Sequence, residues 1–82
     1  MSQEEAYQLY LQRFEAAGGK FAGAVVKKFT LEEFTSKWTD FVDIRNAYEA
    51  MLGRGLTVDN VLLRELRDRA KELVIELPPS MR

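Results

Sequence analysis

The side chains that come closest to a functional pattern lie in LLRELRDRAK, residues 62–71, where ten positions hold four cations. At 100° per residue, Arg64, Arg67 and Lys71 share one side of a helix, where they could contact phosphate. Carboxylates on the facing arc balance them: Glu65, Asp68, Glu72 and Glu76. Because carboxylates repel phosphate, this pattern favours an ordinary solvated helix surface, with nucleic-acid binding as the alternative.

A second basic cluster lies in KFAGAVVKKF, residues 20–29, and consists of Lys20, Lys27 and Lys28. Interleaved phenylalanines give this stretch the composition of a contact for single-stranded nucleic acid or for a membrane surface. The net charge of −1 provides no overall field toward either partner. We therefore interpret the lysines as groups that solubilise a short apolar segment, and we expect no nucleic-acid partner.

Residues suited to catalysis or metal binding are few. The sequence contains no cysteine and no histidine, which removes thiolate chemistry, the commonest general base and the commonest metal ligand. Asp40 and Asp43 lie about 60° apart on one helix face, but the glycine turn and alternating oxygen ligands of a calcium loop do not accompany them. The five glycines match no phosphate-binding loop. We expect a non-catalytic protein without a cofactor or a metal site.

Capping signals predict three helices, and these helices must position the charged side chains described above. The stretch SQEE is a capping box that predicts a helix over residues 3–17, ended by the following glycine pair. The stretch TLEE opens a second helix over 31–52. Thr57 caps a third helix over 58–77, which two prolines end, so that residues 78–82 form a tail.

Residues 20–29 are ambiguous. Apolar residues spaced four apart fit a short helix, whereas two adjacent valines and an interior glycine suit a short strand, with residues 73–77 as its partner. We favour the helix. The expected fold is all-α, a compact three- to four-helix bundle in a single domain of residues 1–82. Its apolar stripes include Tyr10 on the first helix, Phe34 and Leu52 on the second, and Leu66, Leu73, Val74 and Leu77 on the third.

The second predicted helix carries apolar groups on two sides. Its main stripe is aromatic and includes Trp38, while Ile44 and Met51 belong to a smaller patch on the other side. Arg45 projects into the aromatic stripe, so we expect it to pair with Glu49 at the edge of the bundle or to mark an interface. A helix that is apolar on two sides is central in its bundle or touches a second molecule. We therefore predict that Trp38, Ile44, Arg45 and Met51 contribute to a partner-binding surface.

These observations favour a small non-catalytic protein–protein interaction or regulatory module, which binds a protein partner or itself as a homodimer. A nucleic-acid-binding helical domain that uses either basic cluster is the first alternative, and an accessory subunit of an enzyme complex is the second. No apolar run reaches the roughly 18 residues of a membrane span, and the N-terminus does not resemble a signal peptide. We therefore expect a cytoplasmic protein.

Overall fold

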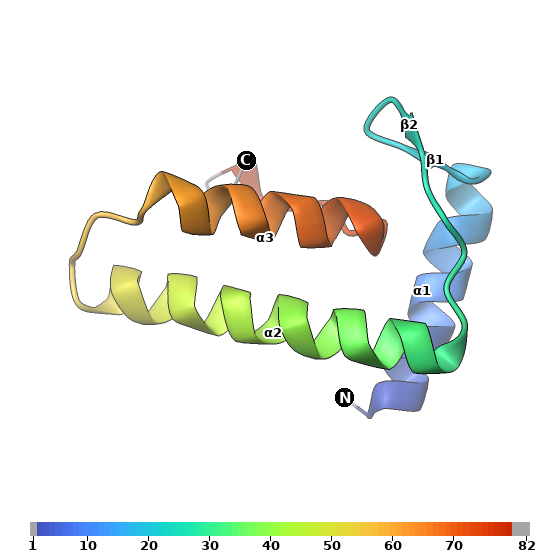
Figure 1. Cartoon of the computed structure of the whole chain (residues 1–82), viewed down its shortest axis with the longest axis horizontal. Coiled ribbons are helices and arrows are strands. Elements are labelled where there is room, and N and C mark those ends of the chain that lie inside the picture. The colour runs from blue at the N-terminus through green and yellow to red at the C-terminus, as the bar shows by residue number, and fades with distance from the viewer. Residues whose placement is uncertain (1, 80–82) are drawn as a thin grey trace.

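The computed structural model describes residues 2–79, which are mostly helical (Figure 1). The elements follow the order α1 (Gln3–Ala17), β1 (Lys20–Phe21), β2 (Ala24–Val25), α2 (Leu31–Gly53) and α3 (Asn60–Glu72). The antiparallel helices α2 and α3 lie side by side, and α1 crosses the N-terminal end of α2 at a steep angle. The predicted helical character is confirmed. The arrangement is not clearly a three- or four-helix bundle, because α1 runs steeply across the end of α2 and not alongside the other helices, and a small hairpin takes the place of a fourth helix.

Side-chain caps start the first two helices. In α1, the Ser2 hydroxyl accepts a hydrogen bond from the Glu5 backbone N–H at 3.2 Å. Before α2, the Thr30 hydroxyl accepts from the Glu33 N–H at 3.3 Å, and the Glu33 carboxylate accepts from the Thr30 N–H at 3.1 Å. This is the reciprocal pair of a capping box. Both helices therefore begin at the predicted residues, and α2 ends one residue later than predicted.

The third predicted helix, residues 58–77, is longer than α3 at both ends. At its start the N-cap is Asp59 and not Thr57, because the Asp59 carboxylate accepts a hydrogen bond from the Val61 N–H at 2.8 Å. Both residue types are good caps, so the sequence did not distinguish them.

All three helices of the described chain end in a Schellman motif, where a residue in the left-handed conformation follows the helix. That residue is Gly18 after α1 (φ 65°) and Gly55 after α2 (φ 70°). After α3 it is Val74 (φ 55°), a β-branched residue for which this conformation is unfavourable. The two hydrogen bonds of the motif are formed there at 3.2 and 2.8 Å, so the predicted continuation of the helix to residue 77 is wrong.

Burial and a distant arginine explain this early end. Leu73, Val74 and Leu77 are buried, as the predicted stripe requires, but a turn and an extended segment place them in the core. From α1, the Arg13 guanidinium donates to the Val74 carbonyl at 3.0 Å and to the Leu73 carbonyl at 3.3 Å. Burial lowers the pKa of Arg13 from its usual value. Most of the predicted tail over 78–82 lies outside the described residues.

Residues 20–29 contain a β-hairpin, so the favoured short helix is wrong. Its strands β1 and β2 pair with each other in antiparallel register, and not with residues 73–77. The two-residue turn consists of Ala22 (φ 53°) and Gly23 (φ 80°). Two central residues with positive φ are typical of a type I′ turn, whose twist matches that of paired strands.

Replacing Ala22 by asparagine is expected to raise the free energy of unfolding by about 0.5–1 kcal/mol. Asparagine tolerates the left-handed conformation better than alanine, and Asn-Gly is a preferred type I′ pair. Urea unfolding monitored by circular dichroism measures the change. Ala16→Asn, at an exposed position inside α1, is the matched control and should destabilise the protein, because asparagine is a poorer helix former. A loss of stability in Ala22→Asn would contradict the turn assignment.

Aromatic rings fill the core where α1 crosses α2. Tyr10, Phe34, Leu66 and Leu73 are its largest fully buried side chains, and all four belong to the predicted stripes. The Phe34 ring centroid lies 5.2 Å from that of Tyr10 and 5.3 Å from that of Tyr7. Aromatic pairs at such distances add to the stabilisation from burial. The crossing of α1 and α2 is therefore fixed by rings from both helices.

Two tyrosine hydroxyls tie α1 to the segment between the hairpin and α2. The Tyr10 hydroxyl accepts a hydrogen bond from the Phe29 N–H at 2.9 Å and donates to the Lys27 carbonyl at 3.1 Å. The Tyr7 hydroxyl donates to the Phe29 carbonyl at 3.2 Å. Burial raises the pKa of Tyr10 above its usual value. Through these contacts α1 positions the segment that carries the hairpin.

Candidate functional site

Two of the predicted partner-binding residues belong to an aromatic row on α2. Trp38 lies between Phe34 and Phe41: it is stacked on the Phe34 ring at 5.8 Å and tilted against the Phe41 ring at 5.9 Å between centroids. The Arg45 guanidinium lies over the Phe41 ring, 5.7 Å from its centroid. The expected Arg45–Glu49 ion pair does not occur among the ion pairs of residues 2–79. A cation–π contact takes its place, because the guanidinium can cover a ring and still reach water.

The other two predicted residues lie in different surroundings on the same helix. Ile44, like Trp38, is half-buried and packs against the core. Met51 lies near the C-terminal end of α2, where its carbonyl accepts a hydrogen bond from the Leu56 N–H at 3.0 Å. Phe41 thus brings Trp38 and Arg45 together, whereas Met51 lies beside the α2–α3 turn.

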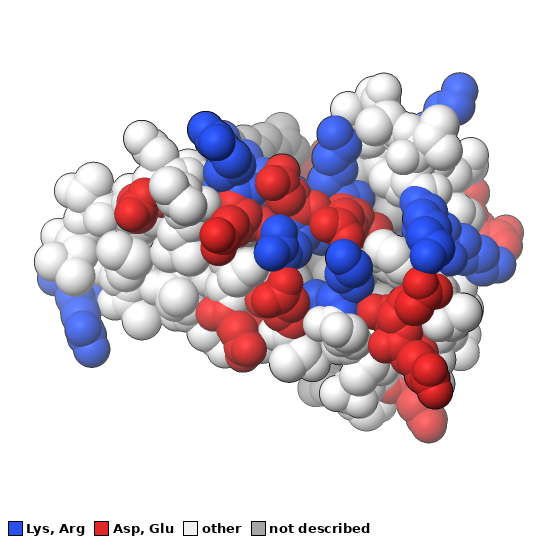
Figure 2. Space-filling view, in the orientation of Figure 1, with Lys and Arg blue, Asp and Glu red and all other residues white. Residues whose placement is uncertain are grey.

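Exposed apolar side chains gather at this turn. Leu52, Leu56 and Val61 are 51%, 50% and 62% exposed, and together they form the apolar tip. The turn lies at the left end of Figure 1, and the same end of the surface carries few charged groups in Figure 2. Val61 lies off the apolar stripe of its helix in the sequence, but the exposure of Leu52 was not predicted, because Leu52 fits the core stripe of its helix. The available signal was the stretch GRGL, in which two glycines place a leucine on a turn.

Ion pairs join the N-terminal half of α2 to the C-terminal end of α3. Lys37 Nζ lies 2.7 Å from Glu72 Oε2, and Arg69 Nε lies 2.7 Å from Asp40 Oδ2. The hydrogen bond to Asp40 raises the pKa of Arg69. Figure 2 shows the result, a band in which cations and anions alternate. Such a band lacks the continuous positive field that phosphate binding requires.

One lysine from each of the two basic clusters lies at the same hollow of the surface. Lys27 and Lys71 line one hollow of about 550 Å³, between the hairpin and the facing ends of α2 and α3. Lys37 lines the same hollow. The remaining members of the clusters are exposed and lie outside it: Lys20, Lys28, Arg64 and Arg67. The predicted nucleic-acid contacts are therefore distributed over several surfaces.

Glutamates neutralise most of the charge in this hollow. Lys27 Nζ lies 2.7 Å from Glu33 Oε2, and Lys37 is paired with Glu72. Hydrogen bonding, above all from Lys27, lowers the pKa of Glu33 to about 2, so this carboxylate is ionised at neutral pH. Three lysines against two glutamates leave one cation, Lys71, which forms no ion pair with the residues that the structure describes.

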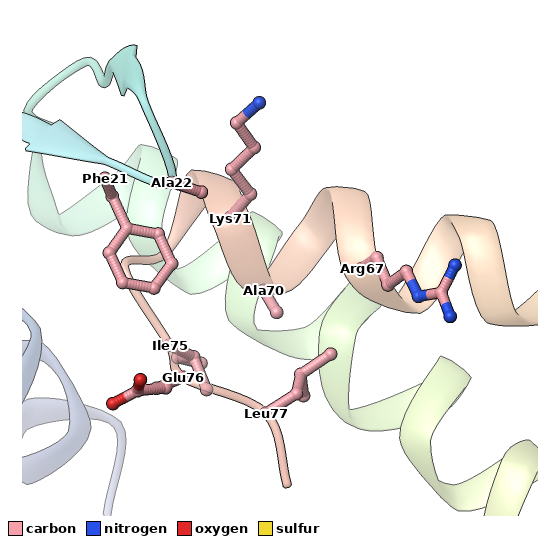
Figure 3. A pocket seen from close by; sticks show the side chains of 8 residues that line it. All are labelled: Phe21, Ala22, Arg67, Ala70, Lys71, Ile75, Glu76 and Leu77. Atoms are coloured by element: carbon pink, nitrogen blue, oxygen red, sulfur yellow. The ribbon is translucent and has the colours of Figure 1, made fainter. Parts of the chain in front are cut away.

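A second hollow, the apolar cavity, has a volume of about 420 Å³ and lies between the hairpin, α3 and the extended segment after α3 (Figure 3). Its apolar lining comes from Phe21, Ala22, Ala70, Ile75 and Leu77. The charged residues at its edge are Arg67, Lys71 and Glu76. Lys71 is the residue that this cavity shares with the hollow described above.

Three further findings concern membrane spans, metal ions and known proteins. None of the described helices is long and apolar enough to cross a membrane. Within residues 2–79, no group of three or more acidic side chains is arranged to hold a metal ion. Comparison of the chain with known protein families, with curated proteins and with solved structures gives no match. The surfaces described above are therefore the basis for a functional assignment.

Proposed function

We propose that the protein is a small non-catalytic interaction module that self-associates through the apolar tip. One observation carries the proposal: three of the six exposed large apolar side chains of residues 2–79 lie at the turn between α2 and α3. Toward the opposite end of the same helix pair, ion pairs join the N-terminal half of α2 to the C-terminal end of α3 instead. Clustered apolar surface on a small protein commonly marks a contact with another protein.

The charges beside the tip suit a second copy of the chain. Arg54 follows α2 and Asp59 caps α3, and both residues are exposed. In a two-fold symmetric dimer a patch meets itself, so Arg54 of one copy can approach Asp59 of the other. A tip flanked by one cation and one anion is therefore self-complementary. Burial of its apolar groups would also support a domain whose own core is small.

Sedimentation equilibrium over a wide concentration range tests this proposal. The wild-type protein is expected to show a monomer–dimer equilibrium. Leu56→Glu is expected to raise the dimer dissociation constant roughly 10- to 100-fold. Each copy has a leucine that is 50% exposed, so the two copies together lose the burial of about one leucine, about 1.5–3 kcal/mol. If a substitution elsewhere on the surface leaves the dissociation constant unchanged, the weakening by Leu56→Glu shows that the apolar tip carries the association.

The matched control is Leu9→Glu, which changes a leucine of α1 that is 40% exposed. It introduces the same charge far from the tip and is expected to leave the dissociation constant unchanged. A wild-type protein that remains monomeric throughout would contradict self-association. Equal weakening by Leu9→Glu and Leu56→Glu would show that the effect is one of charge and not of the tip.

The other roles considered above receive less support. Basic residues of α3 alternate with carboxylates on the surface, which does not favour nucleic-acid binding. An accessory subunit would use the same apolar tip against a different protein surface, and this role stays a prediction, as does a cytoplasmic location.

A further inference from the structure

We propose that the apolar cavity binds a small amphipathic anion, a molecule with an apolar body and one carboxylate-like group. Its volume of about 420 Å³ lies within the range of roughly 300–1,000 Å³ that is usual for small-molecule sites. Such sites are lined mainly by apolar side chains and carry few polar groups, as this cavity does. The cavity adjoins the hairpin and the C-terminal end of α3, whereas the apolar tip adjoins the N-terminal end of α3.

The inside of the cavity suits an apolar body. In Figure 3 the Phe21 ring descends from the hairpin toward Ile75, and the Ala70 methyl group projects from α3 toward the same space. Leu77 closes the far side. Phe21 and Ile75 are half-buried, so a ligand between them would remove further apolar surface from water.

The charge at the edge selects an anion. Lys71 is the cation that remains after the ion pairs of the neighbouring hollow are formed. Its stem starts at the edge of the cavity, and in Figure 3 its ammonium group extends along the hairpin, away from the apolar lining. The flexible stem of a lysine can turn this group toward an anion at the edge. The carboxylate of Glu76 points away from the cavity in Figure 3. An anionic group next to Lys71 would therefore gain a partner without displacing an existing ion pair.

The walls of the cavity are held in unusual backbone conformations. Ala22, which lines it, and Val74, which precedes Ile75, are the two non-glycine residues with positive φ in the described chain. Such conformations persist where surrounding contacts impose them, here the strand pairing of the hairpin and the bonds from Arg13. Walls fixed in this way reduce the ordering that a ligand must bring about on binding.

Octanoate and 1-octanol are suitable probes because they share a similar chain and differ in charge. Titration of each into the ¹⁵N-labelled protein, followed by amide chemical shifts, is expected to give saturable changes at Phe21, Ala70, Ile75 and Leu77. Octanoate is expected to bind about two- to fivefold more tightly than 1-octanol, because a partly exposed ion pair with Lys71 contributes little free energy. Absence of saturable shifts with octanoate, or shifts confined to the apolar tip, would overturn the proposal.

Variants of two lysines separate a specific anion contact from general attraction. Lys71→Gln is expected to weaken octanoate binding about two- to fivefold and to leave 1-octanol binding unchanged. Lys28→Gln removes an exposed lysine that lines neither hollow and is expected to change neither affinity. Equal losses in both variants, or tighter binding of 1-octanol than of octanoate to the wild-type protein, would contradict the role assigned to Lys71.

Discussion

Replacing Arg13 by methionine is expected to lower the free energy of unfolding by about 1.5–3 kcal/mol, the usual contribution of hydrogen bonds to a charged group. Methionine keeps an apolar stem of similar reach but cannot donate to the carbonyls of Leu73 and Val74. Val74 would then remain in an unfavourable left-handed conformation without the bonds that help to impose it. Urea unfolding measures the loss, and amide shifts of residues 73–77 show where it acts.

The control for Arg13→Met is Gln12→Met, which introduces the same side chain at the exposed neighbouring position on α1. Surface substitutions of this kind usually change stability by less than about 0.5 kcal/mol. If Arg13→Met were no more destabilising than Gln12→Met, the guanidinium would not hold the end of α3 in solution.

Replacing Tyr10 by phenylalanine is expected to cost about 1–3 kcal/mol of stability, because it leaves the buried Phe29 N–H without a partner. The same substitution also removes the bond to the Lys27 carbonyl. The ring itself is retained, so packing against Phe34 is preserved. Thermal and urea unfolding measure the effect, and faster exchange of the Phe29 amide proton would localise it.

Tyr7→Phe provides the comparison for this second substitution. The Tyr7 hydroxyl makes one hydrogen bond, to the Phe29 carbonyl, and a carbonyl in a half-buried position can be solvated instead. A smaller loss of about 0.5–1.5 kcal/mol is expected. A larger loss in Tyr7→Phe than in Tyr10→Phe would contradict the importance given to the buried Phe29 N–H.

Features that depend on neighbours in the sequence could be predicted. The starts of α1 and α2 follow from capping side chains that act over three positions, as the bonds of Ser2 and Thr30 show. The apolar stripes placed Tyr10, Phe34 and Leu66 in the core because a helix turns by a constant angle per residue. Local chemistry was sufficient in these cases.

Features that depend on distant contacts or on unusual turn residues could not be predicted. The usual signal of a type I′ hairpin is Asn-Gly, and Ala22 in the first position conceals it. The end of α3 is fixed in part by Arg13, which is 60 and 61 positions away from the carbonyls it contacts. A helical stripe continues through this point in the sequence, so no local signal marks the stop.

The same contrast between local signals and distant contacts applies to the candidate surfaces. Lys71 could be identified as a basic residue, but its place beside Lys27 depends on the hairpin that the sequence did not reveal. Glu72, the oppositely charged partner of Lys37, lies on another helix. The periodicity of residues within one helix could therefore not reveal this ion pair. The helical angle assigns Leu52 to the apolar stripe of α2. Leu52 is nevertheless exposed, because the C-terminal end of α2 extends beyond the start of α3, which could otherwise cover it.

The bonds from Arg13 also bear on the order in which the chain assembles. Helices α2 and α3 are consecutive and joined by a short turn, so closing them against each other costs little chain entropy. The Arg13–Val74 contact joins positions 61 residues apart and needs both α1 and the end of α3 in place. We therefore expect it to form after the folding transition state, so that this contact slows unfolding more than it accelerates folding.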